Sequence, residues 1–519
     1  MFDAFRRSPL LAIGLLATLA VALWFRLNNL AGSPFWLDEG YSAYGAEKGF
    51  AFIFTILPGY ETHPPFYSAL LRCWTLITGN SILGFRSLGA VAGLLALPLY
   101  WRCGWEVAKA NGRNPAWGGL AVLALAAVTP ALVDWTRGVR PYPLIMLVYA
   151  AGLWSVLRMA RGLREEDRLP DMPWCLYLLC QALLFWLHNL GSLYVAGLGL
   201  GLLILCGPLV FLQRYKLRFL IGHALVLMVA LPAFLILLDQ APTWTSSTWL
   251  TFNSATVPIK LMLIYGLPGL GGVLFALLLG GMALRAGFRT PAALLVMALL
   301  PVLASLAISY AFAPVFLPRT LVATAVPMVV LLGLGATSGG RIGGVVFALL
   351  LMQTTIYENA VQKLGPQENW YGATAWLKAH AKPGDMIYAY PNEGALPLHY
   401  ALRESGMTIP VRPIPEAVPS HDPTGWYPTG SRGVVSLPQY RLEQIAGDTQ
   451  SKQVPTIWLL RLGAEKYDPG DGFLKALSRD RREVARWHEG PVFIIGLQQS
   501  ALPVRALGER VPLGIPRAN

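Results

Sequence analysis

The sequence predicts a polytopic α-helical membrane protein that carries a C-terminal α/β domain outside the membrane. Of its 519 residues, 55% are hydrophobic and only 13% are charged, whereas soluble proteins carry about 25% charged residues. Apolar runs of about 20 residues, each long enough to cross a bilayer as a helix, recur up to Asn359. Beyond that point the runs stop, and less than a third of the chain holds nearly half of its charged residues.

The first apolar run follows Arg6 and Arg7 and has no small-x-small cleavage site. It therefore predicts a retained membrane anchor rather than a cleaved signal peptide. In chain order, the apolar runs predict eleven spans at 9–30, 84–103, 116–133, 141–160, 173–190, 192–212, 217–239, 259–284, 291–312, 319–337 and 342–359.

The apolar segment 63–79 is short and contains Arg72. Counting it as a span would invert every later loop. We therefore expect a helix that begins after Pro64 and Pro65 and lies along the outer membrane interface. It belongs to a structured first outer loop, residues 31–83.

The net charge of +13 comes largely from basic clusters that fall between spans, which is the pattern of the positive-inside rule. We therefore predict a cytoplasmic N-terminus, an outer C-terminus and contact with membrane lipids, but no nucleic-acid partner. The basic loop residues on the predicted cytoplasmic side are Arg6, Arg7, Arg102, Lys109, Arg113, Arg158, Arg161, Arg164, Arg168, Arg214, Lys216, Arg218, Arg285, Arg289 and Arg341.

Two domains follow: a transmembrane catalytic domain over 1–359 and a soluble α/β domain over 360–519. In the second, NWYGATAWLKAHAK predicts an amphipathic helix, and DMIYAY, VPTIWLLRL and VFIIGLQ predict strands. The five cysteines lie in or beside apolar segments without metal-ligand spacing, which is typical of buried thiols.

The stretch FWLDEGYS places Asp38 and Glu39 just beyond the first span. One interpretation is a solvated pair that caps a helix starting near Gly40, because aspartate is a good N-cap. The other is a general base at the membrane edge, where partial desolvation makes a carboxylate more basic.

His63, in the same loop, is either a structural hydrogen-bonding residue or a ligand. With Glu61 and the two acids it would form a carboxylate and imidazole site for a divalent metal. The sequence leaves both interpretations open.

The stretch VDWTRGVRPYPL crowds Asp134, Arg137, Arg140 and Tyr142 at another outer edge. The arginines either extend to lipid phosphates or grip the phosphate of a substrate with their planar guanidinium groups. Arg319 lies before a later span on the same predicted face. We expect these groups to bind an anionic lipid-linked substrate.

His188 and Asn189, in FWLHNLGS, mark a further outer edge and either line the same cavity or serve a local structural role. The predicted loop 240–258 is polar and contains Trp244 and Trp249. Tryptophan prefers the membrane interface in any case. These two side chains either stack on a sugar or cover a cavity for a lipid phosphate, and both interpretations stay open.

The order of these motifs resembles the GT-C superfamily of lipid-linked-sugar glycosyltransferases, in its protein O-mannosyltransferase-like and ArnT-like branch. The resemblance rests on Asp38–Glu39 after the first span, on the HPPFY segment, on Arg140-Pro141-Tyr142, on Arg319 before a late span, and on the outer C-terminal domain. It covers most of residues 1–400.

The resemblance implies an inverting glycosyltransferase with a periplasmic active site. Its donor would be a sugar on a polyprenyl phosphate, and its acceptor a hydroxyl of a lipid, glycan or protein. Asp38 would be the base, and Arg140 and Arg319 would hold the phosphodiester. Family members use no nucleotide sugar directly, which agrees with the lack of a glycine-rich nucleotide motif.

The sequence departs from this family at two places. Many relatives carry an acid two residues before the arginine of Arg140-Pro141-Tyr142, where this chain has Gly138, so Asp134 is the candidate for a second acidic role. Relatives often have tyrosine after the late-span arginine, where this chain has Thr320.

Other functions remain as alternatives: a GT-C-like oligosaccharide polymerase or ligase, a transporter or flippase of a lipid-linked sugar, or a receptor or scaffold. Transporters tend to carry charges at mid-membrane and inverted repeats, and the sequence shows neither. The composition and the lack of a eukaryotic targeting signal favour the inner membrane of a bacterium. The sequence identifies no cofactor, apart from the divalent metal left open above.

Overall fold

The computed structural model describes all residues except 1–7, 60, 62, 248–250, 418–435 and 504–519. The chain divides into two compact units. The first comprises Met1–Ala31 and Gly45–Leu364, and the second comprises Gly32–Tyr44 and Gly365–Asn519. Each unit is described by itself.

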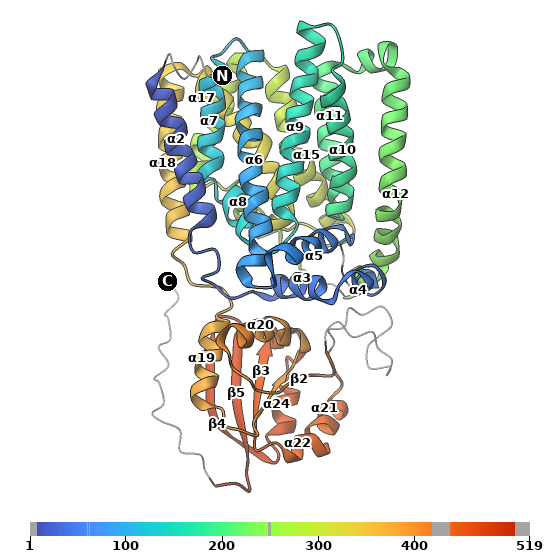
Figure 1. Cartoon of the computed structure of the whole chain (residues 1–519), viewed down its shortest axis with the longest axis vertical. Coiled ribbons are helices and arrows are strands. Elements are labelled where there is room, and N and C mark those ends of the chain that lie inside the picture. The colour runs from blue at the N-terminus through green and yellow to red at the C-terminus, as the bar shows by residue number, and fades with distance from the viewer. Residues whose placement is uncertain (1–7, 60, 62, 248–250, 418–435, 504–519) are drawn as a thin grey trace. The chain divides into compact units, whose positions relative to one another are not determined.

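The first unit is a bundle of apolar helices (Figure 1). Among the described residues, eight helical segments are long and apolar enough to cross a membrane. In chain order they are α2 (Pro9–Leu27), α6 (Ile82–Ala110), α9 (Tyr142–Glu165), α12 (Lys216–Ser247), α14 (Gly269–Ala283) with the turn η5 (Leu284–Ala286), α15 (Arg289–Ala311), α16 (Pro318–Leu321) through η6 (Val322–Thr324) to α17 (Ala325–Ser338), and α18 (Gly340–Val361).

Three further apolar segments complete the bundle. Helix α7 (Pro115–Val128) continues into α8 (Pro130–Val133) and the 3-10 turn η2 (Asp134–Arg137) with a bend of 82°. Helices α10 (Asp171–Leu187) and α11 (Gly191–Cys206) are shorter. Each of the eleven predicted ranges thus contains an apolar helix, and the predicted fold class is confirmed.

Two predicted boundaries were wrong. The range 259–284 is not one helix, because α13 (Val257–Tyr265) ends at Gly266 in a left-handed conformation (φ 62°) before α14 begins. A Cβ at Gly266 would lie 2.7 Å from Thr129 Cγ2, so this turn packs closely against the bend between α7 and α8.

The second error concerns the predicted loop 240–258. Helix α12 continues through its first residues to Ser247, since the drop in hydropathy after Leu238 ends an apolar run but not a helical hydrogen-bond ladder. Trp244 lies in this helix, and Trp249 lies outside the described residues. A short 3-10 turn, η4 (Ser254–Thr256), then leads into α13.

The segment between α2 and α6 folds into short helices. These are α4 (Phe50–Thr55), the 3-10 turn η1 (Leu57–Gly59) and α5 (Phe66–Thr78), which lie across one end of the bundle (Figure 1). Helix α5 begins directly after Pro65, as predicted, and its 13 residues are too few to span a bilayer.

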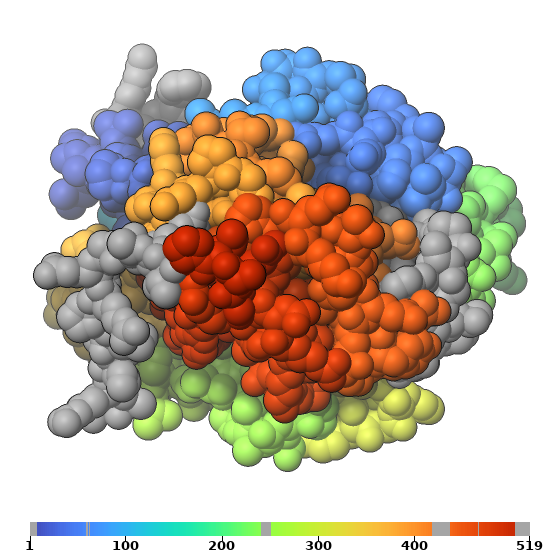
Figure 2. Space-filling view, turned by 90° about the horizontal axis from the view of Figure 1, so that it is seen from below, coloured from blue at the N-terminus to red at the C-terminus, as the bar shows by residue number. Residues whose placement is uncertain are grey.

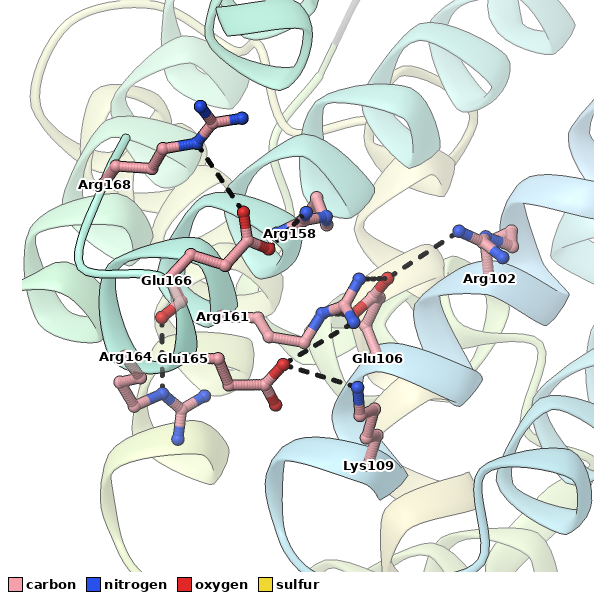
Figure 3. Close-up of polar contacts among 10 residues, drawn as sticks. Arg102, Glu106, Lys109, Arg158, Arg161, Arg164, Glu165, Glu166 and Arg168 are labelled. Carbon is pink, nitrogen blue, oxygen red and sulfur yellow. Dashed lines mark hydrogen bonds and ion pairs between the residues drawn. The ribbon is translucent and has the colours of Figure 1, made fainter. Parts of the chain in front are cut away.

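Ion pairs join the C-terminal ends of α6 and α9 (Figure 3). Glu106 is buried and lies 2.7 Å from Arg161 Nε, and Glu165 lies 3.4 Å from Lys109 Nζ. Arg158 and Glu166 pair at 2.7 Å. Most of the arginines here belong to the predicted cytoplasmic clusters, and part of their charge is neutralised by these glutamates. A π-helical turn, η3 (Val210–Arg214), lies between α11 and α12.

Among its described residues, the second unit contains a five-stranded sheet in the order β2-β1-β3-β5-β4. The pairs β1–β2 and β1–β3 are parallel, whereas β3–β5 and β4–β5 are antiparallel. The strands are β1 (Met386–Ala389), β2 (Val411–Pro413), β3 (Thr456–Leu462), β4 (Arg481–Glu489) and β5 (Val492–Gln499).

Helices cover both faces of this sheet (Figure 1), because successive side chains of a strand point to opposite faces. Ile387 and Trp458 face α19 (Trp370–His380) and α20 (Ala395–Ser405), which follows the 3-10 turn η7 (Asn392–Gly394). Tyr388 and Leu459 face α21 (Gln439–Ala446) and α24 (Gly472–Leu477). The short helices α22 (Thr449–Gln453) and α23 (Ala464–Tyr467) complete the unit, and Figure 2 shows the described residues of its C-terminal part in orange and red.

The predicted helix and three strands of this unit appear as α19, β1, β3 and β5. Strands β2 and β4 were not predicted. The three residues of β2 lie between prolines, and β4 is a charged edge strand whose sequence RREVARWHE lacks an apolar run.

Candidate functional site

The acidic pair belongs to helix α3 (Leu37–Lys48), which begins in the second unit. Asp38 and Glu39 lie in its first turn, so the expectation that Asp38 caps a helix starting near Gly40 was wrong. The N–H of Leu37 instead donates to Glu368 Oε2 at 3.0 Å. Glu39 is only 1% exposed, so it is not a solvated surface acid.

A second group of candidates meets in the first unit around His188. The ring centroids of His63 and His188 lie 4.2 Å apart, and Tyr142 lies 6.2 Å from His188. Electrostatic interactions link His188 to His63, Arg140 and Arg319. These five residues, which we call the His188 cluster, come from four separate parts of the chain.

Local structure places His188 and both arginines of the His188 cluster at helix boundaries. Arg140 is 9% exposed and immediately precedes Pro141 and the start of α9. His188 follows the last residue of α10 in an extended conformation. Arg319 follows Pro318 at the start of α16. Proline at each arginine's boundary fixes the backbone direction there.

The hydrogen bonds of His188 determine its tautomer. Its Nδ1 accepts from the N–H of Leu190 at 3.0 Å, so Nδ1 carries no proton and the neutral ring carries one on Nε2. His188 is 2% exposed, and its Nε2 has no hydrogen-bond partner in the part of the chain that the structure describes. One N–H donor and two guanidinium groups therefore suit an anion with several acceptor oxygens.

Asp134 and Arg137 belong to a different cluster. The carboxyl groups of Asp134 and Glu358 lie close enough to interact electrostatically. Gln362 donates to Glu358 Oε1 at 2.6 Å. Arg137 uses its guanidinium for the carbonyl groups of Phe25, at 2.7 Å, and Asn28, at 2.8 Å.

This arrangement gives Arg137 a structural contact with the end of α2. Arg137 and Gln362 both donate to the carbonyl of Phe25, and so they satisfy the C-terminal end of α2. The sequence analysis did not select Glu358. Glu358 could have been selected from the sequence, because an isolated acidic residue near the end of an apolar span is rare and indicates that a polar partner lies nearby.

A buried arginine supports the bend between α7 and α8. Arg26 is fully buried and donates to the carbonyls of Ala126 at 3.0 Å, Ala127 at 3.2 Å and Leu132 at 3.0 Å. A bend of 82° interrupts the helical ladder and leaves such carbonyls without helical donors. Arg26 replaces those donors.

The structure gives no further support to the metal site considered for His63 and Glu61. Among the described residues, no three His, Cys, Asp or Glu side chains are grouped so that they could hold a metal ion. His63 instead contacts the ring of His188.

Comparison of the sequence with protein-family models and with curated proteins finds no match. Among solved structures, the chain is similar to ArnT from Cupriavidus metallidurans in the apo state, with a TM-score of 0.56 and 14% identity. It is also similar to the same protein bound to undecaprenyl phosphate, with a TM-score of 0.57 and 13% identity. Both similarities cover 93% of this chain and 97% of ArnT.

The chain is also similar to the oligosaccharyltransferase of Archaeoglobus fulgidus in the apo form. The TM-score is 0.51 at 11% identity, over 96% of this chain and 76% of that chain. At these identities the similarity concerns the fold. It confirms, at that level, the resemblance to the GT-C membrane glycosyltransferases.

Proposed function

We propose that this protein is an inverting membrane glycosyltransferase that moves one sugar from a polyprenyl phosphate to a hydroxyl of a lipid, glycan or protein acceptor. The observation that carries the proposal is the His188 cluster, an anion-binding arrangement in a chain whose fold matches ArnT along nearly its whole length. A structure of ArnT holds undecaprenyl phosphate, which supports a donor of this chemical class.

In the proposed reaction, the carboxylate of Asp38 accepts the proton of the acceptor hydroxyl. The hydroxyl oxygen forms a bond with the anomeric carbon while the bond from that carbon to the phosphate oxygen breaks, and the configuration inverts. The electron pair leaves with the polyprenyl phosphate. Arg140, Arg319 and the Nε2–H of His188 stabilise the charge that develops on this leaving group.

We propose transfer of a single sugar rather than of an oligosaccharide, because the fold similarity to ArnT (TM-score 0.56) is greater than the fold similarity to the oligosaccharyltransferase (TM-score 0.51). The positive-inside pattern further supports an inner-membrane orientation in which the C-terminal unit and the active site lie on the periplasmic side.

The first test replaces Arg140 with alanine. Membranes are supplied with a labelled polyprenyl-phosphate sugar pool, and transfer of the label to other molecules is measured against donor concentration. We expect Arg140→Ala to raise the KM for the donor and to lower kcat by about tenfold or more, because a charge-assisted hydrogen bond to phosphate contributes about 1.5–3 kcal/mol. Arg319→Ala is expected to act in the same direction.

Arg158→Ala is the matched control. Arg158 lies near the opposite end of α9 from Arg140, and its partner is Glu166 (Figure 3). Its loss should leave both kinetic constants near the wild-type values. Equal kinetic constants of Arg140→Ala and Arg158→Ala would contradict the phosphate-binding role.

The proposed orientation is tested by adding trypsin to intact spheroplasts. Trypsin should cut the C-terminal unit, and protection of that unit would contradict the proposed orientation.

A further inference from the structure

The segment that carries the acidic pair is part of the C-terminal unit. Residues Gly32–Tyr44 cluster with the residues that begin at Gly365, more than 300 positions later in the chain. Leu37 packs against a hydrophobic cluster that contains Trp370 of α19 and the strand residues Ile387 and Trp458. The first turn of α3 therefore rests on the hydrophobic core of this unit.

Glu368 makes the polar part of this contact. Its Oε2 accepts from the N–H of Leu37 at 3.0 Å and from Trp370 Nε1 at 2.8 Å. The first N–H groups of a helix have no partner within the helix, so Glu368 caps α3 from a distant part of the chain. Trp370 is fully buried, which fixes the orientation of the carboxylate that performs this capping.

Three further contacts hold the same segment. Phe35 packs edge-on against Tyr400, with ring centroids 5.1 Å apart. Tyr41 donates to Glu393 Oε2 at 3.4 Å. Gly40 lies directly over the start of α20, where a Cβ would be 3.3 Å from the nitrogen of Pro397. The absence of a side chain at Gly40 allows this close approach.

We infer that the C-terminal unit positions the catalytic acid and that Glu368 is the positioning residue for Asp38. The inference rests on the proposed function, in which Asp38 is the base. Because Glu368 binds the backbone one residue before Asp38, loss of its carboxylate frees the turn from which the Asp38 side chain projects. The C-terminal unit would then be a required part of the catalytic machinery rather than an accessory domain.

The experiment compares Glu368→Ala with Glu368→Gln in the full-length protein. Glu368→Ala removes the acceptor, and we expect kcat for sugar transfer to fall at least tenfold while the donor KM changes less than twofold. Glu368→Gln keeps an acceptor oxygen for the N–H of Leu37, so it should restore kcat to within about threefold of wild type.

A second readout follows hydrogen exchange in peptides that cover residues 35–42, and it requires no substrate. In Glu368→Ala the exchange of the Leu37 amide should accelerate at least tenfold, and Glu368→Gln should retain most of the protection.

Asp448→Asn serves as the matched control. Asp448 pairs with Arg412 at 2.6 Å, and Arg412 contacts Tyr388, which faces away from the side of the sheet that holds Leu37. This change should leave both the kcat and the exchange of residues 35–42 unaltered.

Wild-type kcat and wild-type exchange in Glu368→Ala would overturn the inference. So would equal losses in Glu368→Ala and Glu368→Gln, because the conservative change would then fail to rescue. If the wild-type protein transfers no sugar but the exchange pattern follows the prediction, the proposed function fails while the docking of α3 on the C-terminal unit stands.

Discussion

Glu368 binds a proton in the folded protein at pH values where a free glutamate does not. Burial, together with the nearby carboxylates of Asp38 and Glu39, raises the pKa of Glu368 to about 7, although the hydrogen bonds from Trp370 and Leu37 act in the opposite direction. The folded state therefore binds more protons than the unfolded state between about pH 4.5 and 7.

This imbalance makes stability depend on pH. The stabilising contribution of Glu368 to the free energy of unfolding is fully present below pH 4.5 and is lost as pH rises through about 7. The loss is about 1.4 kcal/mol for each unit by which the folded-state pKa exceeds the unfolded-state pKa. We expect the free energy of unfolding of the C-terminal unit to fall over this range by more in the wild type than in Glu368→Gln. Hydrogen exchange of β3 and β5, measured over this pH range, reports the free energy of unfolding of the unit. Identical pH profiles of the wild type and Glu368→Gln would contradict the raised pKa of Glu368.

At the level of residues, the sequence alone identifies functional candidates from the motifs around them. It does not reveal which distant residues they contact. Asp38 and Arg140 could be selected because each stands at a predicted membrane edge. Glu368 could not, since its partner Leu37 lies 331 positions away. The tautomer of His188 depends on a backbone N–H two residues later, which becomes visible only when the end of α10 is known.

At the level of elements, the bend between α7 and α8 depends on Arg26. Its guanidinium donates to the carbonyls of Ala126, Ala127 and Leu132 from a fully buried position. We expect Arg26→Met to lower the free energy of unfolding by about 3 kcal/mol or more, because an unsatisfied buried acceptor costs about 1–3 kcal/mol and the membrane interior supplies no replacement donor.

Unfolding in detergent micelles by titration with SDS measures this effect. Trp24→Ala is the control, because Trp24 lies on the same helix and is 60% exposed. If Arg26→Met were as stable as Trp24→Ala, the prediction would be wrong, because the carbonyls at the bend would then have other donors.

Elements were predicted well where periodicity and composition decide them, and less well where distant contacts do. The span 116–133 was predicted as one helix, but Thr129 and Pro130 form a bend that Arg26 supports from another helix. The range 259–284 breaks at Gly266, whose turn fits against the same bend. Within the described part of the chain, strand β4 pairs only with β5, and its charged sequence gave no apolar alternation to detect.

At the level of the whole molecule, the fold class followed from the number and length of the apolar runs, which reflect the thickness of a bilayer. Membership of Gly32–Tyr44 in the C-terminal unit did not follow from them, because this segment lies in the sequence between two membrane helices. This segment carries the proposed catalytic acid, so the distant contacts that the sequence does not reveal bear directly on the function.

The account depends most on Asp38 as the base of a sugar transfer. Its most direct test measures transfer from a labelled polyprenyl-phosphate sugar pool by Asp38→Asn, beside Glu39→Gln and with insertion and folding verified. We predict that Asp38→Asn folds normally and loses at least about a hundredfold in kcat, since a positioned general base contributes about 10²–10⁴. Transfer by folded Asp38→Asn at close to the wild-type rate would contradict the account.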